Sequence, residues 1–461
     1  MSDTDFDVIV VGAGLAGLHA AATLEGVGLR VLVLEAQSRV GGRIHSMRQL
    51  GGTAEAGGTY IGAGYTRVIA AAERHGVELM DVTPILEFFR EQDLALDGEI
   101  IRQADWAAHP ANDFPQRDKQ HLPWNYHRVL TMRDNPLEDP SAWLDERHAA
   151  LDIPAHAWLR SLGLSDRAIA LAYGLNVSFG RDAHDVSALL LLFRGAFSKQ
   201  QRALSSSASL GFTARHGVQR IPEAMAAALA NGVELEHAVT AIALDGSRAV
   251  VTCANGRRLS AHHVVAAVPP SVLRRIALEP ALPPLQAEAV ASLPSQPLTQ
   301  VYFAPRSRFW EQDGYAASLF TDTRAGMLAA ARNRDDPTVV TSFTAWITGD
   351  NAAALDRLPS AADAGRAVIA AIETLRPSAK GQLELIGMHS WGADAYAGGA
   401  WAYFRPGEVT RFAPVLGLAH GRLHFCGEHL ATTSRGMEGA MESAEEAAAA
   451  ILENVRDPRP R

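Results

Sequence analysis

Residues 6–35 read FDVIVVGAGLAGLHAAATLEGVGLRVLVLE, and this stretch decides the fold class. Residues 6–11 are a continuous apolar run that ends at a glycine, which is typical of a buried parallel strand. Residues 15–27 are rich in alanine with helical spacing, and residues 30–34 are a second short apolar run. A strand, a helix and a second strand in this order predict an α/β protein with a doubly wound, Rossmann-like parallel sheet.

Gly12, Gly14 and Gly17 form a GxGxxG pattern between the predicted strand and helix. The first glycine permits a tight turn, the second lets the backbone approach a pyrophosphate, and the third lets the helix pack closely on the strand. Glu35, at the end of the second strand, is placed to accept hydrogen bonds from a ribose diol. The pattern predicts a dinucleotide site with phosphates at the helix N-terminus; the alternative is that the glycines serve packing alone. The predicted contacts here are Gly12, Ala13, Gly14, Gly17, Glu35 and Ala36.

Residues 39–43 read RVGGR and indicate which dinucleotide binds. A site for NAD needs no second pair of glycines and no two arginines so soon after the ribose acid. A loop with small residues and cationic donors suits a longer ligand that lies across the edge of the sheet. The alternative is an ordinary glycine turn with two surface arginines. The contacts predicted here are Arg39, Gly41, Gly42 and Arg43.

Three segments resemble motifs of the flavin-containing amine oxidase superfamily. Residues 7–43 resemble its N-terminal FAD motif, which phytoene-desaturase-like and protoporphyrinogen-oxidase-like enzymes share, so it indicates FAD better than a substrate. Residues 55–60 (EAGGTY) resemble the loop whose backbone lies against the flavin ring, where two glycines remove obstructing Cβ atoms. Residues 425–440 (FCGEHLATTSRGMEGA) resemble the closing signature. The resemblance, with Val239 in the place of an adenine contact, implies cofactor contacts at Gly57, Gly58, Thr59, Tyr60, Val239, Gly427, Glu428, Gly436 and Met437.

The same resemblance points to residues beside the flavin ring. Trp391 and the run at residues 398–401 (GGAW) resemble the family's W…GG-x-aromatic stretch. Trp401 matches one wall of the aromatic cage of monoamine oxidases, whereas the other wall falls at Gly436 and is missing. Some amine oxidases link FAD to a cysteine in this stretch; Ala400 stands there, which implies FAD held without a covalent bond. The alternative for Trp401 is an ordinary core residue, although its position favours the cage. Asn176, Val177 and Ser178 match a pocket-lining segment, and packing at a helix end explains these three residues equally well.

Gln300 stands where many family members carry a lysine near flavin N5. It is found by counting back from the pair Phe309-Trp310. A lysine ammonium stabilises charge that develops on oxygen, whereas a neutral amide supplies only a dipole. A slow reaction with oxygen is therefore expected; the alternative is that Gln300 is an ordinary strand residue. The residues implied for catalysis are Gln300, Trp391, Trp401 and Gly436.

The resemblance implies FAD-dependent oxidation of an amine. A neutral amine would pass a hydride from its α-carbon to flavin N5 and become an imine, which water would hydrolyse to a carbonyl; oxygen would then be reduced to hydrogen peroxide. The alternatives are an amine dehydrogenase with a protein or quinone acceptor, a desaturase-type flavoenzyme of a non-amine substrate, and a flavin-binding protein without catalysis. The amine is not identified. An amino acid would need a cation for its carboxylate, and Arg194, Arg202 and Arg215 offer one without any being singled out.

The chain is expected to interleave two domains in the glutathione-reductase-like architecture that the resemblance implies. Residues 162–197 have helical character, and residues 233–268 alternate around two hairpin signals, which indicates a small antiparallel sheet. Residues 264–268 are expected to return to the first sheet as a strand, and His262-His263 to lie at the surface. The FAD-binding domain is predicted at residues 1–83, 210–285 and 421–461, and an α+β substrate domain at residues 84–209, mainly helical, and 286–420.

Composition excludes several classes of protein. The chain has 461 residues, 48% of them hydrophobic and 20% charged, as in a globular protein of two or three domains. A formal charge of −9 argues against a nucleic-acid partner. Two cysteines and scattered histidines predict neither a disulfide framework nor a metal site, and no apolar run approaches the roughly 18 residues that span a bilayer. The acidic N-terminus fits no signal peptide, so a cytoplasmic protein is expected, and a homodimer is a further expectation.

Overall fold

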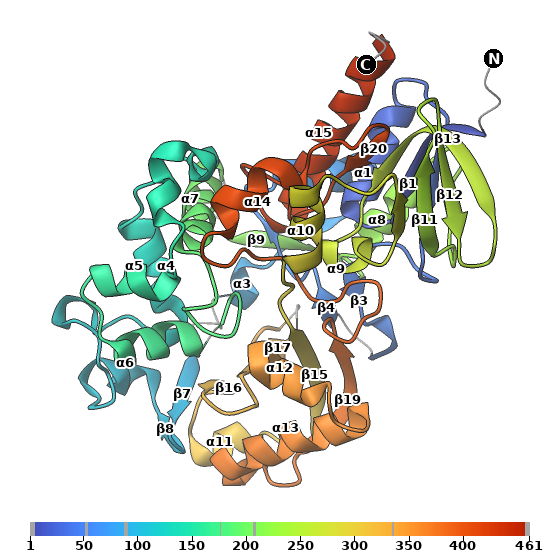
Figure 1. The fold of residues 1–461 in the computed structure, drawn as a ribbon. Helices are drawn as coiled ribbons and strands as arrows, with labels where there is room; N and C mark the ends of the chain where they lie inside the picture. Colours follow the sequence, from blue (N-terminus) through green and yellow to red (C-terminus); the bar gives the residue numbers. More distant parts are fainter. Residues whose placement is uncertain are drawn as a thin grey trace.

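The computed structural model describes residues 5–50, 54–86, 91–175, 177–205, 209–333 and 336–456. Two large sheets lie one above the other in Figure 1, and a group of helices stands beside them. The chain enters the upper sheet at its N-terminus, crosses to the lower sheet and returns, so the first and last segments lie together. The interleaved α/β architecture predicted from the sequence is confirmed.

β1 (Phe6–Val11), α1 (Leu15–Glu25) and β2 (Val31–Leu34) form the predicted strand–helix–strand unit of the upper sheet. β1 pairs in parallel with β2 and with β13 (Arg258–Ala266). All four residues of β2 are buried, as expected for a central parallel strand. The other strands of this sheet are β10 (Val233–Glu234), β11 (Val239–Leu244), β12 (Ala249–Cys253), β14 (Ala277–Glu279) and β20 (Leu423–Phe425).

The antiparallel strands that follow residue 233 belong to this same sheet rather than to a separate small one. β13 pairs with β12 in antiparallel fashion at its start and with β1 in parallel along its later part, so one strand serves both. The strand expected at residues 264–268 is therefore the end of β13. His263, expected at the surface, is buried beside β20, with its Nδ1 3.2 Å from Nε2 of His424.

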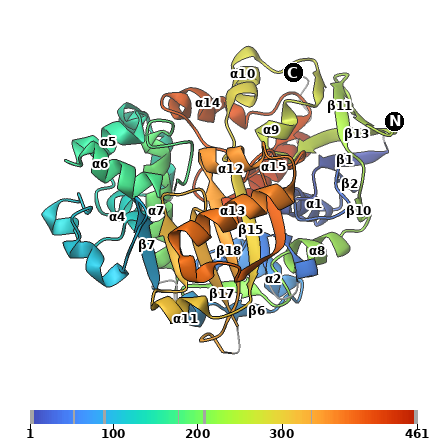
Figure 2. The same ribbon diagram turned by 90° about the horizontal axis from the view of Figure 1, so that it is seen from below.

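The lower sheet has seven strands, and α12 (Gly349–Leu355) and α13 (Ala361–Leu375) pack against it, as Figure 2 shows from below. In spatial order the strands are β19 (Leu383–Ser390), β15 (Leu298–Pro305), β18 (Val340–Thr348), β17 (Met327–Arg332), β16 (Ser318–Thr321), β7 (Gln92–Leu96) and β8 (Glu99–Ile101).

The helix predicted at residues 162–197 is wrong in its middle. α6 (Asp166–Ile169) and η7 (Ala170–Gly174) end before the loop at residues 177–187, and α7 (Ala188–Leu204) begins after it. Gly180 adopts a φ of +70°, and the Ser187 hydroxyl accepts a hydrogen bond from the Leu189 N–H at 3.2 Å. A left-handed turn and a new N-cap thus interrupt a pattern whose apolar spacing continues.

The remaining strands form two small sheets, and helices and short turns make up the remaining elements. Two small sheets pair β3 (His45–Ser46) with β4 (Glu55–Gly57), and β9 (Gly211–Ala214) with both β5 (Ile61–Gly62) and β6 (Leu79–Asp81). The other helices are α2 (Thr66–Arg74), α3 (Thr83–Leu86), α4 (Pro123–Arg133), α5 (Ala155–Ser161), α8 (Arg220–Ala227), α9 (Pro270–Leu273), α10 (Pro284–Ser292), α11 (Phe309–Asp313), α14 (Glu408–Leu416) and α15 (Gly436–Arg456), with short 3₁₀ turns η1 (Arg48–Leu50), η3 (Gln103–Ala108), η4 (Gln116–Asp118), η5 (Pro140–Leu144), η6 (Glu146–Leu151) and η8 (Pro377–Ala379).

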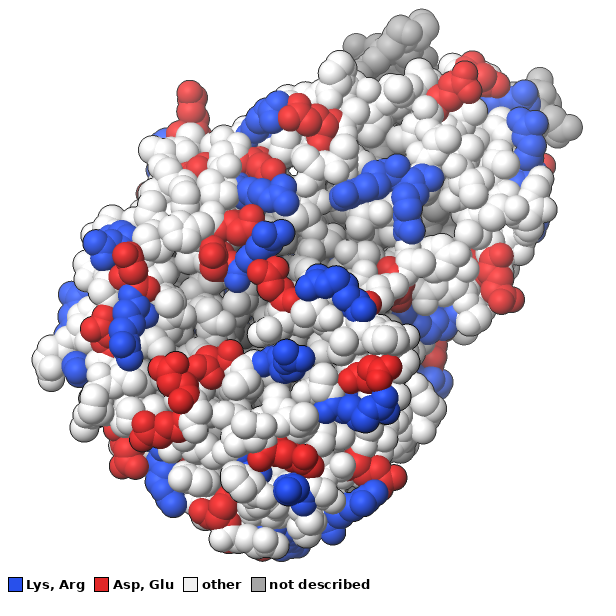
Figure 3. Space-filling view, turned by 60° about the horizontal axis from the view of Figure 1, so that its bottom comes forward, with Lys and Arg blue, Asp and Glu red and all other residues white. Residues whose placement is uncertain are grey.

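Basic and acidic side chains are interspersed over the face that Figure 3 shows. Within the described ranges, no helix is both long enough and apolar enough to cross a bilayer. Among the same residues, no three His, Cys, Asp or Glu side chains gather closely enough to hold a metal ion.

Candidate functional site

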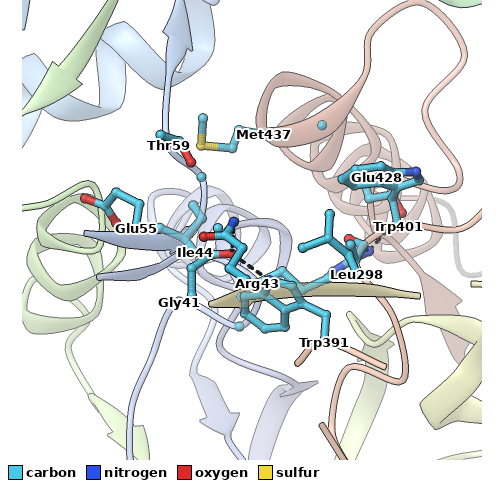
Figure 4. A pocket seen from close by; sticks show the side chains of 18 of the residues that line it. Gly41, Arg43, Ile44, Glu55, Thr59, Leu298, Trp391, Trp401, Glu428 and Met437 are labelled. Carbon is cyan, nitrogen blue, oxygen red and sulfur yellow. Dashed lines mark hydrogen bonds and ion pairs between the residues drawn. The ribbon is translucent and has the colours of Figure 1, made fainter. Parts of the chain in front are cut away.

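A cavity of about 1690 Å³ lies between the two sheets and the helices beside them. Segments far apart in the sequence line it: the turn after β1, the loop after β2, β15 of the lower sheet, α7, and the start of α15. Figure 4 labels residues of the loop after β2, of the 55–59 segment, of β15 and of the start of α15, together with Trp391, Trp401 and Glu428, around one space. Residues predicted from separate sequence motifs therefore line the same cavity.

One end of the cavity is the turn between β1 and α1. A Cβ atom on Gly17 would lie 2.0 Å from the Gly12 carbonyl oxygen, whereas one on Gly14 would meet no atom within 4 Å. Gly17 thus allows the helix to pack on the strand, and Gly14 leaves its backbone open to the cavity. The Glu35 carboxylate accepts hydrogen bonds from the N–H groups of Ala13 at 2.7 Å and Gln37 at 2.8 Å, and it lines the cavity. This arrangement suits a ribose and a pyrophosphate.

The glycine loop after β2 packs against this turn. Gly41 and Gly42 adopt φ values of +107° and +54°, and a Cβ atom on Gly42 would lie 3.2 Å from the Gly14 Cα. Arg39 does not line the cavity. Its guanidinium donates to the Gly42 carbonyl at 2.9 Å, so it holds the loop in shape. Arg43 does line the cavity.

Arg43 and Glu428 join three distant segments of the chain. The Arg43 guanidinium donates to Glu428 Oε1 at 2.9 Å and to the Ala400 carbonyl at 3.1 Å. The Ala402 N–H donates to the same Glu428 oxygen at 3.0 Å. Burial alone would raise the pKa of Glu428, but the positive charge of Arg43, with smaller contributions from His429 and Arg435, holds this pKa below its ordinary value. The carboxylate is therefore ionised at neutral pH, and the pair fixes the wall of the cavity.

The backbone of residues 55–57 is fixed by side chains from the lower sheet and its following segment. The Ala56 carbonyl accepts hydrogen bonds from the Trp391 indole at 2.7 Å and the Gln300 amide at 3.2 Å, while the Tyr302 hydroxyl donates to Gln300 Oε1 at 2.6 Å. A Cβ atom on Gly57 would lie 2.2 Å from the Arg43 carbonyl oxygen. The glycine is thus required by the protein's own packing. Tyr302 was not anticipated, although it stands two residues after Gln300 on the same face of a strand.

The other end of the cavity contains the residues predicted for the substrate. The Trp401 indole donates to the Ser178 carbonyl at 2.9 Å, and its ring meets that of Phe179 edge-on at 6.3 Å. Gly436 lines the cavity with a φ of +59°, and the atom nearest to a Cβ built on it is the Tyr65 hydroxyl oxygen, 4.0 Å away. The gap predicted at Gly436 is therefore open space.

Comparison with known proteins decides the family. Residues 15–452 match the family described as flavin containing amine oxidoreductase. This chain belongs to that family. It is 27% identical to an amine oxidase [flavin-containing] of Danio rerio, over 98% of this chain and 87% of the relative, and 26% identical to amine oxidase [flavin-containing] B of Homo sapiens, over 97% and 86%.

Solved structures agree with this assignment. Cyclohexylamine oxidase from Brevibacterium oxydans superposes with a TM-score of 0.77 at 25% identity, covering 98% of this chain and all of that one. Putrescine oxidase in complex with putrescine, at 24% identity and a TM-score of 0.75 over 97% and 99% of the two chains, shares the fold. The predicted family, the α/β fold and the flavin-dependent oxidation of an amine are confirmed.

FAD, the cofactor of this flavoenzyme, fits the end of the cavity where backbone groups and Glu35 are open to a ligand. When bound, it supplies the two-electron acceptor for amine oxidation. Neither cysteine of the chain lines the cavity and Ala400 does, so no thiol is placed to form a covalent link. Of the predicted site residues, Ala13, Gly17 and Arg39 do not line the cavity, and Asn176 lies outside the described residues. Those that line it are Gly12, Gly14, Glu35, Ala36, Gly41, Gly42, Arg43, Gly57, Gly58, Thr59, Tyr60, Val177, Ser178, Val239, Gln300, Trp391, Trp401, Gly427, Glu428, Gly436 and Met437.

Proposed function

We propose that this flavoenzyme is an oxidase that converts an amine to an imine, which water then hydrolyses to a carbonyl, and that passes the electrons to oxygen as hydrogen peroxide. The observation that carries the proposal is the single cavity that joins the cofactor-binding turn at Gly14 to the walls at Trp401 and Gly436. A substrate held between those walls lies in the same enclosed space as the cofactor, as transfer of a hydride requires.

The proposed roles differ between the implied catalytic residues. Trp401 forms a wall against the amine, and Gly436 leaves room opposite the Tyr65 hydroxyl for a bulky substituent. Gln300 and Trp391 act as positioning residues, because both donate to the Ala56 carbonyl and thereby fix the loop that faces the flavin ring. The amine binds in its neutral form, so that its α-carbon can release hydride without a separate base.

One observation favours a dehydrogenase as the second candidate. Gln300 is buried, and its amide is held by Ala56 and Tyr302. Over the described part of the chain, no lysine lines the cavity. Arg43, the cation of the cofactor end, is paired with Glu428. The neutral amide of Gln300 stabilises reduced oxygen less well than an ammonium group would, so a protein or quinone acceptor is the alternative to oxygen.

The experiment is a screen of primary, secondary and cyclic amines with the FAD-loaded protein. Consumption of oxygen is recorded with production of peroxide, and parallel reactions contain a quinone dye. Equal molar amounts of oxygen and peroxide with at least one amine support the oxidase. Reduction of the dye by amines without oxygen consumption supports the dehydrogenase. Activity confined to substrates without nitrogen would contradict both and support a desaturase-type enzyme.

Other expectations remain predictions. They are a cytoplasmic location, a homodimer, the absence of a nucleic-acid partner, and the five segment boundaries of the two domains. Size-exclusion chromatography with light scattering would test the dimer directly.

A further inference from the structure

Three arginines line the substrate end of the cavity. Arg128 comes from α4, Arg194 from α7, and Arg435 from the residue immediately before α15. All three residues are partly buried, and Arg128 and Arg194 also border a smaller neighbouring cavity. Only Arg194 was considered from the sequence. Three separate segments therefore bring cationic groups to one region that the assigned cofactor contacts do not use.

Two of the three guanidiniums share an aromatic neighbour. The guanidinium carbons of Arg194 and Arg435 lie 5.7 and 5.0 Å from the centre of the Phe179 ring. Burial, together with the positive charge of Arg194, lowers the pKa of Arg128 to about 9. Burial likewise lowers the pKa of Arg435 to about 10. Both values lie well above 7, so the cluster stays cationic at neutral pH.

No carboxylate of the described residues forms an ion pair with this cluster. The two buried acids nearby are engaged elsewhere: Glu428 with Arg43 at 2.9 Å, and Glu438 with Arg67 at 3.3 Å. Arg194 donates to the Ser178 hydroxyl at 2.6 Å, whereas the buried Nε of Arg128 has no hydrogen-bond partner. Cations withdrawn from water without an anion are costly. An anion bound among the three guanidiniums would offset this cost.

The cluster lies beside the proposed reaction site. Ser178 connects them, because its carbonyl accepts from the Trp401 indole and its hydroxyl accepts from Arg194. Arg435 is bonded directly to Gly436, the open wall. Three positive charges repel an ammonium group but attract a carboxylate, and an arginine fork can bind a carboxylate with two parallel hydrogen bonds.

We propose that Arg128, Arg194 and Arg435 form a carboxylate-binding subsite, and that the amine substrate carries a carboxylate a short distance from its nitrogen. This inference rests on the proposed function. Putrescine and cyclohexylamine, named for the two solved relatives, carry no anionic group. The structure also separates the candidates from the sequence: Arg215 pairs with Glu78 at 2.5 Å. Arg202 borders only a smaller cavity of about 230 Å³, whereas Arg194 borders both cavities.

Calorimetric titration of the FAD-loaded protein with phenylacetate and with its neutral isostere phenylacetamide tests the subsite without catalysis. Wild type should bind phenylacetate about tenfold or more tightly than phenylacetamide. Arg128→Met, Arg194→Met and Arg435→Met should each weaken phenylacetate about tenfold and leave phenylacetamide unchanged, while Arg194→Lys should restore part of the loss. Lys199→Met, which alters an exposed cation of the same helix outside both cavities, should change neither.

Equal affinity of wild type for the two probes would overturn the subsite. So would a preference for phenylacetate that survives all three arginine substitutions. Anaerobic reduction of the flavin by 3-amino-3-phenylpropionate and by its amide then tests the chemistry. Tight carboxylate binding with no reduction by any amine would contradict the proposed function and leave the subsite standing. Faster reduction by the amide than by the acid would contradict the inference and leave the proposed function standing.

Discussion

The cofactor half and the substrate half of the cavity differ in how their buried charges are paired. In the cofactor half, around Glu35 and Arg43, backbone groups form much of the wall, and each of these two charged side chains has partners within the chain. In the substrate half, around Ser178 and Arg194, guanidiniums face the cavity with no paired carboxylate among the described residues. A wall with satisfied charges holds its shape before its ligand arrives, whereas a wall with unsatisfied charges selects a ligand by charge.

The largest effect is expected at the glycines of the cofactor half. Gly17→Ala places a Cβ atom 2.0 Å from the Gly12 carbonyl and should lower the free energy of unfolding by about 3 kcal/mol. Gly14→Ala meets no protein atom and should leave folding unchanged, but weaken FAD about tenfold or more because its methyl group occupies the open backbone face. Urea unfolding and FAD titration separate the two. Gly174→Ala, on an exposed helical turn, is the control that should change neither.

The second effect concerns the paired charges. Glu428→Gln leaves Arg43 without its carboxylate and should lower the free energy of unfolding by about 3 kcal/mol. The matched control is Glu288→Gln, which breaks an ion pair with Arg411 whose side chains are about half exposed; it should cost less than about 1 kcal/mol. Similar losses in the two variants, measured by urea unfolding, would show that burial does not distinguish the pairs.

The pH dependence follows from the same carboxylate. Glu428 has a lower pKa in the folded protein than its ordinary value, because Arg43 outweighs the effect of burial. The contribution of the ionised Glu428 to the free energy of unfolding is therefore complete above its unfolded-state pKa of about 4.3. It disappears as the pH falls through its folded-state pKa. The difference in melting temperature between wild type and Glu428→Gln should stay constant from pH 8 to about 6 and narrow below about 4. A difference in melting temperature that widens as the pH falls would show that the pKa of Glu428 is raised, not lowered, in the folded protein.

A third test adds an unpaired cation to the cofactor half, where Arg43 is already paired with Glu428. Gln300→Lys places an ammonium beside the Ala56 carbonyl and should accelerate reoxidation of the reduced enzyme by oxygen about tenfold or more. Stopped-flow mixing with oxygen measures this rate. Gln300→Met, which has similar size and no charge, should not accelerate it. If both variants react with oxygen at the wild-type rate, this position has no part in the oxidative step.

The smallest effect is expected at the open wall of the substrate half. Gly436→Ala adds a methyl group toward the Tyr65 hydroxyl and should shift the ratio of kcat/KM for bulky against small amines a few-fold toward the small ones. The control is Gly76→Ala, because Gly76 also has a positive φ, +65°, and a Cβ atom there would meet no other atom within 4 Å. Both substitutions carry the same backbone strain of about 1 kcal/mol. An unchanged ratio in Gly436→Ala would show that the gap does not face the substrate.

The cofactor half could be predicted from the sequence because its determinants are local. Gly12, Gly14 and Gly17 act within one turn, and Glu35 follows at the end of the next strand, so spacing alone conveys their geometry. The resemblance of residues 425–440 to the family's closing signature identified Glu428 as a further residue of this half. Its ion pair with Arg43 was not foreseen, since pairing between residues so far apart depends on the tertiary fold.

The substrate half was harder to predict for physical reasons. Arg128, Arg194 and Arg435 belong to three segments with no shared pattern, and an arginine on an amphipathic helix usually faces water. The turn at Gly180 and the cap at Ser187, which place Ser178 beside Trp401, were hidden within an apolar stretch of helical character. A cluster of buried cations from three distant segments depends on the tertiary fold and cannot be recognised from any one segment alone.

Anaerobic titration of the FAD-loaded enzyme with amines tests the central claim most directly. Oxidised flavin has an absorption band in the blue, and at least one amine should abolish this band in the absence of oxygen, with an equivalent amount of imine or carbonyl product. Admission of oxygen should restore the band. A flavin that dithionite or light reduces, but that no amine of any class reduces, would contradict the assignment of the cavity as a site of amine oxidation.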